Sequence, residues 1–347
     1  MMPKGPFFDA LKFTKGLSKL LLGKDLTVSE SKRIFEMLFA GFLPLSKAKA
    51  FLLLLSQKGE TPAEFLGCLR ALRRFEKTSG PRIAGLMDTC GTGGDGRRTL
   101  NISTLAALVL AGAGVRIAKH GNRAISSRSG SSDLMESFGV RLSATQAKMV
   151  QAIRSGGIGY FHAPFYHPVF AAMQPLRQSL KRRTILNLLG PLVNPLRLDH
   201  QLVGVSSRCL LPLYAKVLSQ LGRKTALVCH AIDGMDEIST SKPTQVAWVT
   251  PGKVRYGMLR PETFGLQKAA AKDLTIDSVK KSREIAEKIL TGRERGPARD
   301  LVVLNAAYGL VLCDKAAHVR EGIRLAEQAI DSGRALASLN KLRRLSR

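Results

Sequence analysis

Two short apolar stretches, residues 83–90 and 115–118, each end in a polar loop that leads into a helical pattern. The first loop is rich in glycine, and the second, HGNRAISSRSGSS, is rich in serine. A repeated order of strand, loop and helix is typical of a parallel sheet, because parallel strands need a crossover between them. The alternation therefore predicts an α/β fold with a central, mainly parallel sheet.

The helix between these two strands is expected from the alanine-rich run 105–110, which Gly112 and Gly114 stop. The helix after the second loop is expected to open at Asp133, with Glu136 as its partner in a capping box. The rest of the chain carries further patterns of both kinds. We predict strands over 201–205, 225–230, 245–250 and 254–259, and helices over 276–290, 299–311 and 319–330.

Up to about residue 80 the apolar residues recur at helical spacing, with short breaks between the runs. Two of the breaks carry helix-start signals: Thr27 is followed by Glu30, and Thr61 is followed by Pro62 and Glu64. This pattern predicts a small bundle of about four helices. None of its residues points to chemistry, so packing or dimer contact is the expected role.

The chain is strongly basic, with 54 Lys and Arg against 26 Asp and Glu and a net charge of +28. Such a chain attracts anions, whether nucleic acid, anionic lipid or a phosphorylated small molecule. A soluble surface that is simply rich in Lys and Arg would explain the same excess. Aromatic residues make up only 6% of the chain, which argues against recognition of nucleic acid by base stacking.

The cysteines and the apolar runs indicate in which cellular compartment the protein resides. The 5 cysteines include no C-x-x-C pair, so neither a disulfide framework nor a zinc site is expected, and a reducing compartment fits. No apolar run is long enough to cross a membrane, and the basic N-terminal residues lack the apolar segment of a signal peptide. We therefore expect a cytoplasmic protein without a membrane partner.

The glycine loop, DTCGTGGDGRRTLNIST, fits the dinucleotide fingerprint G-x-G-x-x-G from Gly91 to Gly96. That fingerprint needs an acidic residue about 20 positions further on to hold the ribose, but no Asp or Glu lies between Gly96 and Asp133. A Walker A loop is excluded because no Gly-Lys-Ser/Thr follows. The glycines instead let backbone amides approach an anion, and the helix after Asn101 directs its free N–H groups to the same place.

Both polar loops leave carboxyl ends of predicted parallel strands, where ligands of open α/β sheets bind. Together their donors can surround a phosphate group and part of a sugar. A third polar cluster, Asp233, Asp236 and Glu237, follows the predicted strand 225–230. Adjacent carboxylates suit Mg²⁺, which prefers oxygen ligands and often bridges to phosphates, although a solvated acidic turn would have the same sequence.

These stretches, in this order, resemble the anthranilate phosphoribosyltransferases, in the superfamily of glycosyltransferases and nucleoside phosphorylases. The resemblance covers nearly the whole chain and is carried by DTCGTGGDGRRTLNIST, AKHGNRAISSRSGSSDLMESFGV, APFYHP, PLRQSLKRRTILNLLGPLVNP and DGMDEIS. It implies a small helical domain of residues 1–82, joined by helices from about 166–194, and a large α/β domain of residues 83–347. It further implies a homodimer built through the helical domains.

The implied reaction transfers the phosphoribosyl group of phosphoribosyl pyrophosphate to the amine of anthranilate, in tryptophan biosynthesis. The resemblance implies that Ser103, Asp236 and Glu237 hold Mg²⁺, with two ions per subunit, and that Gly91, Asn122 and Arg177 meet anthranilate. Lys119 would stabilise the pyrophosphate, and His120 is the nearest candidate for a general base. The implied contacts of phosphoribosyl pyrophosphate are Gly91, Gly94, Asp95, Thr99, Asn101, Ile102, Ser103, Thr104, Lys119, His120, Gly121, Asn122, Arg123, Ala124, Ile125, Ser126, Ser127 and Ser131.

The chain departs from the family pattern in places. Tyr160-Phe161-His162 stands where the family has a more apolar stretch, so that His162 either borders the anthranilate channel or is an ordinary hydrogen-bonded histidine. Lys181 replaces a usual glycine, and the positive charge is high for the family. Two alternatives remain: a nucleic-acid binder on the same fold, which would not need the glycine loop and Asp236-Glu237, and a nucleoside phosphorylase, against which HGNRAISS and Arg177 argue.

Overall fold

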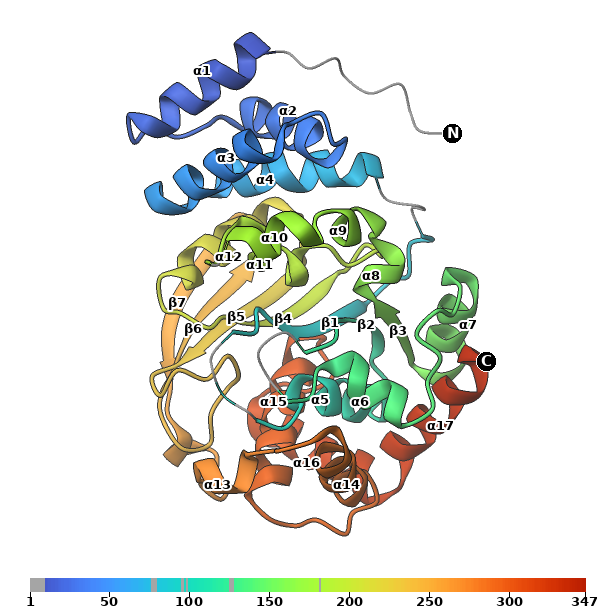
Figure 1. Cartoon of the computed structure of the whole chain (residues 1–347). Coiled ribbons are helices and arrows are strands. Elements are labelled where there is room, and N and C mark those ends of the chain that lie inside the picture. The colour runs from blue at the N-terminus through green and yellow to red at the C-terminus, as the bar shows by residue number, and fades with distance from the viewer. Residues whose placement is uncertain (1–9, 76–79, 95–96, 98, 125–127, 181) are drawn as a thin grey trace. The chain divides into compact units, whose positions relative to one another are not determined.

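The structure is a computed structural model of the 347-residue chain. It describes every residue except 1–9, 76–79, 95–96, 98, 125–127 and 181 (Figure 1). The chain forms two compact units, one of Met1–Ser79 with Tyr166–Val193 and the other of Gly80–Phe165 with Asn194–Arg347. No helix in the described part of the chain combines the length and apolar character needed to cross a bilayer.

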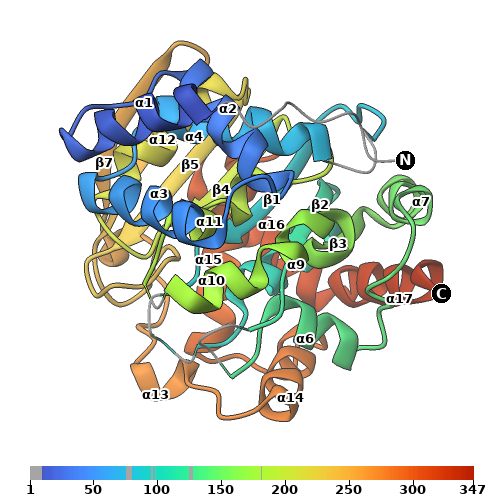
Figure 2. The same ribbon diagram turned by 45° about the horizontal axis from the view of Figure 1, so that its top comes forward.

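The first unit is helical, as the periodic N-terminal region predicts (Figure 2). Both predicted capping boxes are present: the Thr27 and Thr61 side chains accept the N–H groups of Glu30 and Glu64. Buried aromatic rings form the core, with Phe35 and Phe51 edge to face at 5.2 Å. Its helices are α1 (Ala10–Leu21), α2 (Val28–Phe39), α3 (Leu45–Lys58), α4 (Pro62–Leu72), η1 (Arg73–Phe75), α9 (Pro168–Ala172), α10 (Gln174–Leu180), α11 (Ile185–Leu188) and η2 (Gly190–Leu192).

The second unit is built on a seven-stranded sheet in the order β3-β2-β1-β4-β5-β6-β7. The five strands from β3 to β5 are parallel, and β6 and β7 continue the sheet antiparallel. The predicted α/β fold with a mainly parallel sheet is confirmed. The strands are β1 (Leu86–Gly91), β2 (Arg116–Gly121), β3 (Ile158–His162), β4 (His200–Gly204), β5 (Thr225–Ala231), β6 (Thr244–Thr250) and β7 (Lys253–Leu259).

Helices cover the sheet and bury its apolar strands. The crossover from β1 to β2 contains α5, and the crossover from β4 to β5 contains α12 and runs the other way across the sheet. Because such crossovers are right-handed, the two helices lie on opposite faces, as Figure 1 shows. The helices outside the first unit are α5 (Ile102–Gly112), α6 (Ser131–Ser137), α7 (Gln146–Gly156), α8 (Ala163–Tyr166), α12 (Leu210–Gln220), η3 (Pro261–Thr263), α13 (Ala271–Leu274), α14 (Val279–Leu290), α15 (Pro297–Leu312), α16 (Val319–Asp331) and α17 (Arg334–Ser346).

The expected start of the helix after the second loop is wrong. Helix α6 begins at Ser131, with Gly130 at its N-cap, and Asp133 occupies the third helical position. The Asp133 carboxylate accepts the N–H of Gly130 at 2.9 Å, so Asp133 is the reciprocal member of the cap. Glu136 does not cap the helix, because it lies three positions beyond Asp133, and its carboxylate binds the Arg123 guanidinium through both oxygens.

Candidate active site

The candidate site lies where the chain changes direction across the sheet. Strands β1 and β4 are parallel neighbours, and the connections that leave them run toward opposite edges of the sheet. Gly91 and Gly204, the last residues of these strands, are paired in register. A switch of this kind leaves a crevice beyond the carboxyl ends of the two strands, which is the usual ligand site of an open α/β sheet.

The turn that carries Asp236 packs directly onto these two strand ends. A Cβ at Gly204 would overlap the backbone carbonyl of Asp236, and a Cβ at Gly91 would overlap its carboxylate. Only glycine allows such an approach at both positions. The opposite side of the turn is fixed by Asn305 of α15, whose side chain accepts the N–H of Ile238 and donates to its carbonyl, both at 3.0 Å.

The two predicted metal ligands meet the glycine loop and the start of α5. The Asp236 carboxylate accepts the N–H of Gly93 at 3.0 Å, and the Glu237 carboxylate accepts the N–H of Ser103 at 3.1 Å. The second bond places a negative charge at the N-terminus of α5, which the helix dipole favours. The third acidic residue of the cluster, Asp233, pairs with Arg97 at 3.8 Å.

The donor set suits Mg²⁺. Asp236, Glu237 and Ser103 supply hard oxygens, and all three residues are partly exposed at the crevice. Among the described residues there is no group of three or more His, Cys, Asp and Glu that could hold a metal. Two carboxylates and a hydroxyl fit an ion that keeps water ligands and takes further oxygens from substrate phosphates, rather than one held in a cage of protein ligands.

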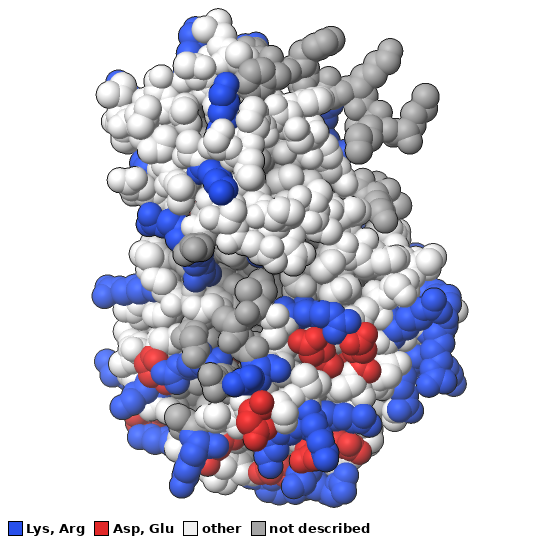
Figure 3. All heavy atoms as spheres, viewed as in Figure 1, with Lys and Arg blue, Asp and Glu red and all other residues white. Residues whose placement is uncertain are grey.

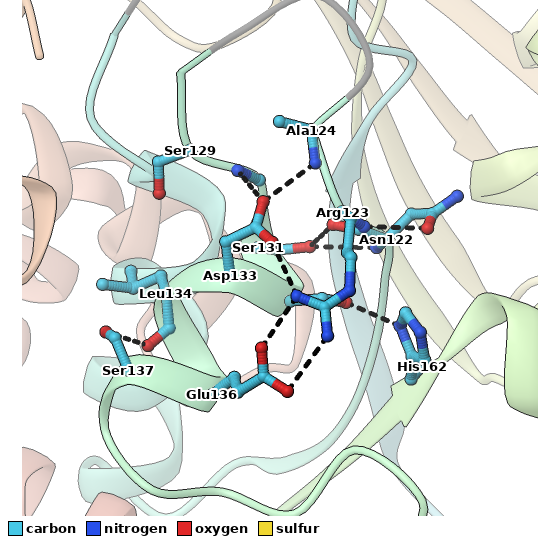
Figure 4. Close-up of polar contacts among 12 residues, drawn as sticks. Asn122, Arg123, Ala124, Ser129, Ser131, Asp133, Leu134, Glu136, Ser137 and His162 are labelled. Atoms are coloured by element: carbon cyan, nitrogen blue, oxygen red, sulfur yellow. Dashed lines mark hydrogen bonds and ion pairs between the residues drawn. The ribbon is translucent and has the colours of Figure 1, made fainter. Parts of the chain in front are cut away.

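The second loop is tied to the first loop and to α6, and Figure 4 shows the contacts with α6. Asn101, at the start of α5, exchanges two hydrogen bonds with Ser129, at 3.1 and 3.2 Å. The Asp133 carboxylate accepts the N–H groups of Ala124 and Gly130 at 3.0 and 2.9 Å and binds Arg123 through its other oxygen at 2.9 Å. The two ends of the second loop are therefore held together, and the Arg123 guanidinium is engaged by carboxylates.

The other predicted contacts are distributed around the two loops. Thr99 forms an isolated bridge with Thr275, and Gly94 is exposed with a φ of +75°. Ile102 and Thr104 are buried on α5, and the Thr104 hydroxyl has no hydrogen-bond partner among the described residues. The predicted residues Asp95, Ile125, Ser126 and Ser127 lie outside the described residues, as does Lys181.

Lys119 and His120 lie at the end of β2 and are almost completely buried, with 2% and 4% exposure. The Lys119 ammonium donates to the carbonyl of Thr89 at 2.6 Å. Asp88, on β1, accepts the N–H of His120 at 3.3 Å and the amide of Asn194 at 3.0 Å. In this arrangement the Lys119 ammonium is bonded to the neighbouring strand β1, close enough to the buried Asp88 carboxylate to interact with its charge.

The stability of the second unit should depend on pH through Asp88. Burial raises the pKa of Asp88 from 3.8 to about 6, against the opposing charge of Lys119. The folded state then holds this proton more tightly than the unfolded state does, so stability present below about pH 4 is lost as the pH rises to about 6. We expect the free energy of unfolding, relative to that of Asp88→Asn, to fall by about 2–3 kcal/mol across this range.

Urea unfolding of both proteins at several pH values measures this difference. The Asp88→Asn variant also loses one of the two hydrogen bonds that Asp88 accepts, but the cost of that loss does not vary with pH. The exposed Asp277→Asn variant is the matched control. A difference between wild type and Asp88→Asn that stays constant from about pH 4 to 7 would contradict the raised pKa.

Arg177 belongs to the first unit, on α10. It is partly buried, its Nε is buried and has no hydrogen-bond partner among the described residues, and burial lowers the pKa of its guanidinium. A desolvated guanidinium of this kind favours a planar anion that can accept two parallel hydrogen bonds, such as a carboxylate.

Sequence reasoning missed four residues that shape the site: Asp88, Asn194, Gly204 and Asn305. Two of them had signals that could have been used. Asn305 is a lone polar residue in the apolar run LVVLNAAYGL, and Gly204 interrupts the strand pattern QLVGV, which indicates a close backbone approach. Asn194 lies in a polar break, NPLRLD, that is typical of an ordinary turn.

Comparison with known proteins agrees with this geometry. The model of the glycosyl transferase family a/b domain matches residues 84–336, and that of the helical bundle domain matches residues 15–75. The chain is 42% identical to the anthranilate phosphoribosyltransferase of Rubrobacter xylanophilus, over 96% of this chain and 97% of that protein. It is 43% identical to that of Desulfitobacterium hafniense, over 95% and 97%.

Solved structures of the same enzyme superpose over almost the full length. That from Thermus thermophilus has a TM-score of 0.89 at 37% identity and covers 95% of this chain and 99% of its own. The Saccharomyces cerevisiae enzyme, in complex with PRPP and Mg, has a TM-score of 0.89 at 25% identity, over 97% and 98%. The sequence identity and both domain matches show that this chain belongs to the anthranilate phosphoribosyltransferase family.

Proposed function

We propose that this chain transfers the phosphoribosyl group of phosphoribosyl pyrophosphate to the amine of anthranilate. The products are N-(5-phosphoribosyl)anthranilate and pyrophosphate, and the step belongs to tryptophan biosynthesis. The observation that carries the proposal is the meeting of Asp236 and Glu237 with the glycine loop and α5 at the switch between β1 and β4. A sugar pyrophosphate needs a site for a divalent cation next to a helix N-terminus that favours anions, and this crevice has both.

In this proposal Ser103, Asp236 and Glu237 hold Mg²⁺, with two ions per subunit. When bound, Mg²⁺ would neutralise charge that develops on the pyrophosphate leaving group. The glycine loop and the positive end of the α5 dipole lie beside the two carboxylates, and the dipole favours an anionic group there. The buried Lys119 adds a positive charge near the end of β2, which favours an anionic leaving group in a site of low dielectric.

The chain needs no nucleophile of its own for this reaction. An aromatic amine is uncharged at neutral pH and attacks C1 of the ribose directly, through a transition state that resembles an oxocarbenium ion. The residues of the site therefore act by positioning and by electrostatic stabilisation. His120 remains the nearest candidate for a base, and it is buried at the end of β2.

A fluorescence assay tests the proposal. Anthranilate is fluorescent, so its signal should fall when the purified protein is mixed with Mg²⁺ and phosphoribosyl pyrophosphate. The loss should require all three components. A signal that stays constant at every Mg²⁺ concentration, with protein shown to be folded, would contradict the proposed reaction.

Arg177 is proposed to bind the anthranilate carboxylate, and the desolvated guanidinium supports that role. Arg177→Gln should raise the KM for anthranilate by about 10- to 100-fold, the loss of a bidentate charge-assisted pair. The KM for phosphoribosyl pyrophosphate should change less than about twofold. Steady-state kinetics with each substrate varied in turn measures both, and the exposed Arg182→Gln is the control. Equal changes in the two KM values would contradict this role.

We also propose that residues 1–82 and about 166–194 act as the small domain, that two copies pair through it, and that the enzyme is cytoplasmic. The first unit exposes several large apolar side chains that a partner could cover, namely Leu11, Leu21, Leu22, Phe42 and Leu45. Light scattering on the eluting protein measures the mass. A monomer at micromolar concentration would contradict the dimer.

The positive charge is consistent with anionic substrates. Lys and Arg lie over much of the visible face of the second unit, with a dense group toward α7 and α17 (Figure 3). A field of this sign raises the rate at which anions such as the two proposed substrates reach the protein. We do not propose that the protein binds nucleic acid. A gel-shift titration at physiological salt would detect such binding.

A further inference from the structure

A chain of polar side chains links the edge strand β3 to the second loop. Tyr160 is buried on β3, and its hydroxyl lies 3.1 Å from Ser131 Oγ and 2.8 Å from Ser132 Oγ. Ser132 Oγ is also 2.8 Å from Nδ1 of His162, at the end of the same strand. At the other end, Ser131 Oγ accepts the N–H of Asn122 at 3.1 Å and donates to its carbonyl at 3.2 Å.

The number of available protons fixes the direction of every bond in this chain. The carbonyl of Asn122 only accepts, so the Ser131 hydroxyl donates to it, and Tyr160 must then donate to Ser131. The single proton of Tyr160 is thereby used, so the Ser132 hydroxyl donates to Tyr160. Ser132 has no second proton, so His162 must donate to it from Nδ1.

The Ser131 end of this row of hydrogen bonds holds the backbone of Asn122 in one place. Ser131 Oγ satisfies both its N–H and its carbonyl, and Ser132 donates its own N–H to the same carbonyl at 3.0 Å. A Cβ at Gly121 would overlap Ser131 Oγ and the Tyr160 hydroxyl. The segment that begins the second loop therefore rests directly on the two hydroxyls, and a shift of either moves Asn122.

We infer that Tyr160, Ser132 and His162 are positioning residues that hold the backbone of Asn122 in its substrate-binding position, with His162 protonated on Nδ1. The inference rests on the proposed function, since the resemblance to the family implies that Asn122 meets both substrates. His162 thus has a hydrogen-bonded role at the loop.

The surroundings of His162 agree with a structural proton on Nδ1. The imidazole is partly buried at the rim of a pocket of about 470 Å³, whose lining includes Arg123, Glu136 and Phe165. Figure 4 shows its ring directed toward the start of α6, beside the Arg123–Glu136 pair. Burial, together with the Arg123 charge, lowers the pKa of His162. A neutral ring that donates from Nδ1 still makes the bond to Ser132, so the chain does not require the cation.

The tautomer can be measured without any substrate. The protein has 6 histidines, and comparison of long-range ¹H–¹⁵N spectra of wild type and His162→Phe assigns His162. At about pH 7.5 its Nδ1 should carry the proton and Nε2 should have the shift of an unprotonated nitrogen. A proton on Nε2 with Nδ1 bare would overturn the inference, whatever reaction the enzyme catalyses.

Kinetics tests the positioning role. Tyr160→Phe removes only the hydroxyl, and we expect the KM for phosphoribosyl pyrophosphate to rise about 5- to 10-fold, the effect of one or two hydrogen bonds. His162→Phe should raise it about 3- to 5-fold, and His162→Asn, which returns a donor near Nδ1, should restore it to within about twofold. In each case kcat should change less than about twofold. The exposed Tyr256→Phe on β7 is the matched control.

The double variant separates a connected chain from two independent packing effects. If the bonds act in series, Tyr160→Phe with His162→Phe should raise KM little more than Tyr160→Phe alone. If the KM increases of the two single variants multiply in the double variant, the two residues act independently, which would contradict the connected row of bonds. A lower melting temperature with unchanged KM would contradict positioning and indicate a role in stability alone. If no variant, wild type included, shows turnover, the proposed function fails, and the tautomer measurement still decides the hydrogen-bond chain.

Discussion

Asp236→Asn and Glu237→Gln are each expected to lower kcat by about 100-fold or more. Each change removes one negative charge from the turn at the crevice but keeps an oxygen that can accept the N–H of Gly93 or Ser103. The loop geometry is thereby retained, and the loss falls on Mg²⁺ binding and on stabilisation of the leaving group. The measurement is kcat at saturating substrates across a Mg²⁺ titration.

The matched control for these variants is Glu262→Gln, which removes an exposed carboxylate of the second unit. It should leave kcat and the Mg²⁺ dependence as in wild type. Melting temperatures of all three variants show whether the fold is retained. Wild-type kcat and Mg²⁺ dependence in both Asp236→Asn and Glu237→Gln would remove the metal assignment, whereas loss in only one would assign the metal to that residue.

Gly204→Ala is expected to reduce activity by about 100-fold and to destabilise the second unit by about 1–3 kcal/mol. The new methyl would overlap the backbone carbonyl of Asp236, which is fixed from the other side through Ile238 and Asn305. Gly204 is held in the sheet and the turn is held by Asn305, so neither backbone can move without strain. We expect the turn to shift, which moves the Asp236 and Glu237 carboxylates away from the glycine loop. Activity and urea unfolding of the purified variant measure the two effects.

Gly257→Ala is the control, because a Cβ at Gly257 on β7 meets only the Val246 side chain, at 3.8 Å. The same substitution in the same sheet should therefore leave activity at the wild-type level. Gly91→Ala should fall between the two, since its Cβ overlaps the movable carboxylate of Asp236 rather than backbone. Equal activity of Gly204→Ala and Gly257→Ala would show that the close approach has no part in function.

Much of the architecture could be predicted because its signals are local. Capping at Thr27 and Thr61, the alternation of strands with helices and the later strands depend on residues close together in the chain. Strand β3 and helices α7, α12 and α17 were not predicted. Their patterns are ordinary amphipathic or short apolar runs, and tertiary packing decides whether such runs become helix or strand.

The site was predictable in outline, since glycine and serine loops after parallel strands meet at one edge of a sheet. The start of α6 was not predictable, because Asp133 suits both an N-cap and the third position of a capping box. Arg123 binds Asp133 and Glu136 alike, and the Asp133 carboxylate also accepts the N–H of Gly130. The N-cap position is taken by Gly130, which has no capping side chain and therefore gives no capping signal in the sequence.

By itself, the sequence determined the α/β class, the two polar loops that follow β1 and β2, the acidic pair and the family. These features depend on residue type and short spacing, which persist in any fold that forms. The tertiary structure alone decided that Gly204 faces the Asp236 backbone, that Asn305 fixes the turn from 67 residues away, and that Tyr160 and His162 support Asn122. The physical reason is that hydrogen bonds and close contacts act over a few ångströms in space, whatever their separation along the chain.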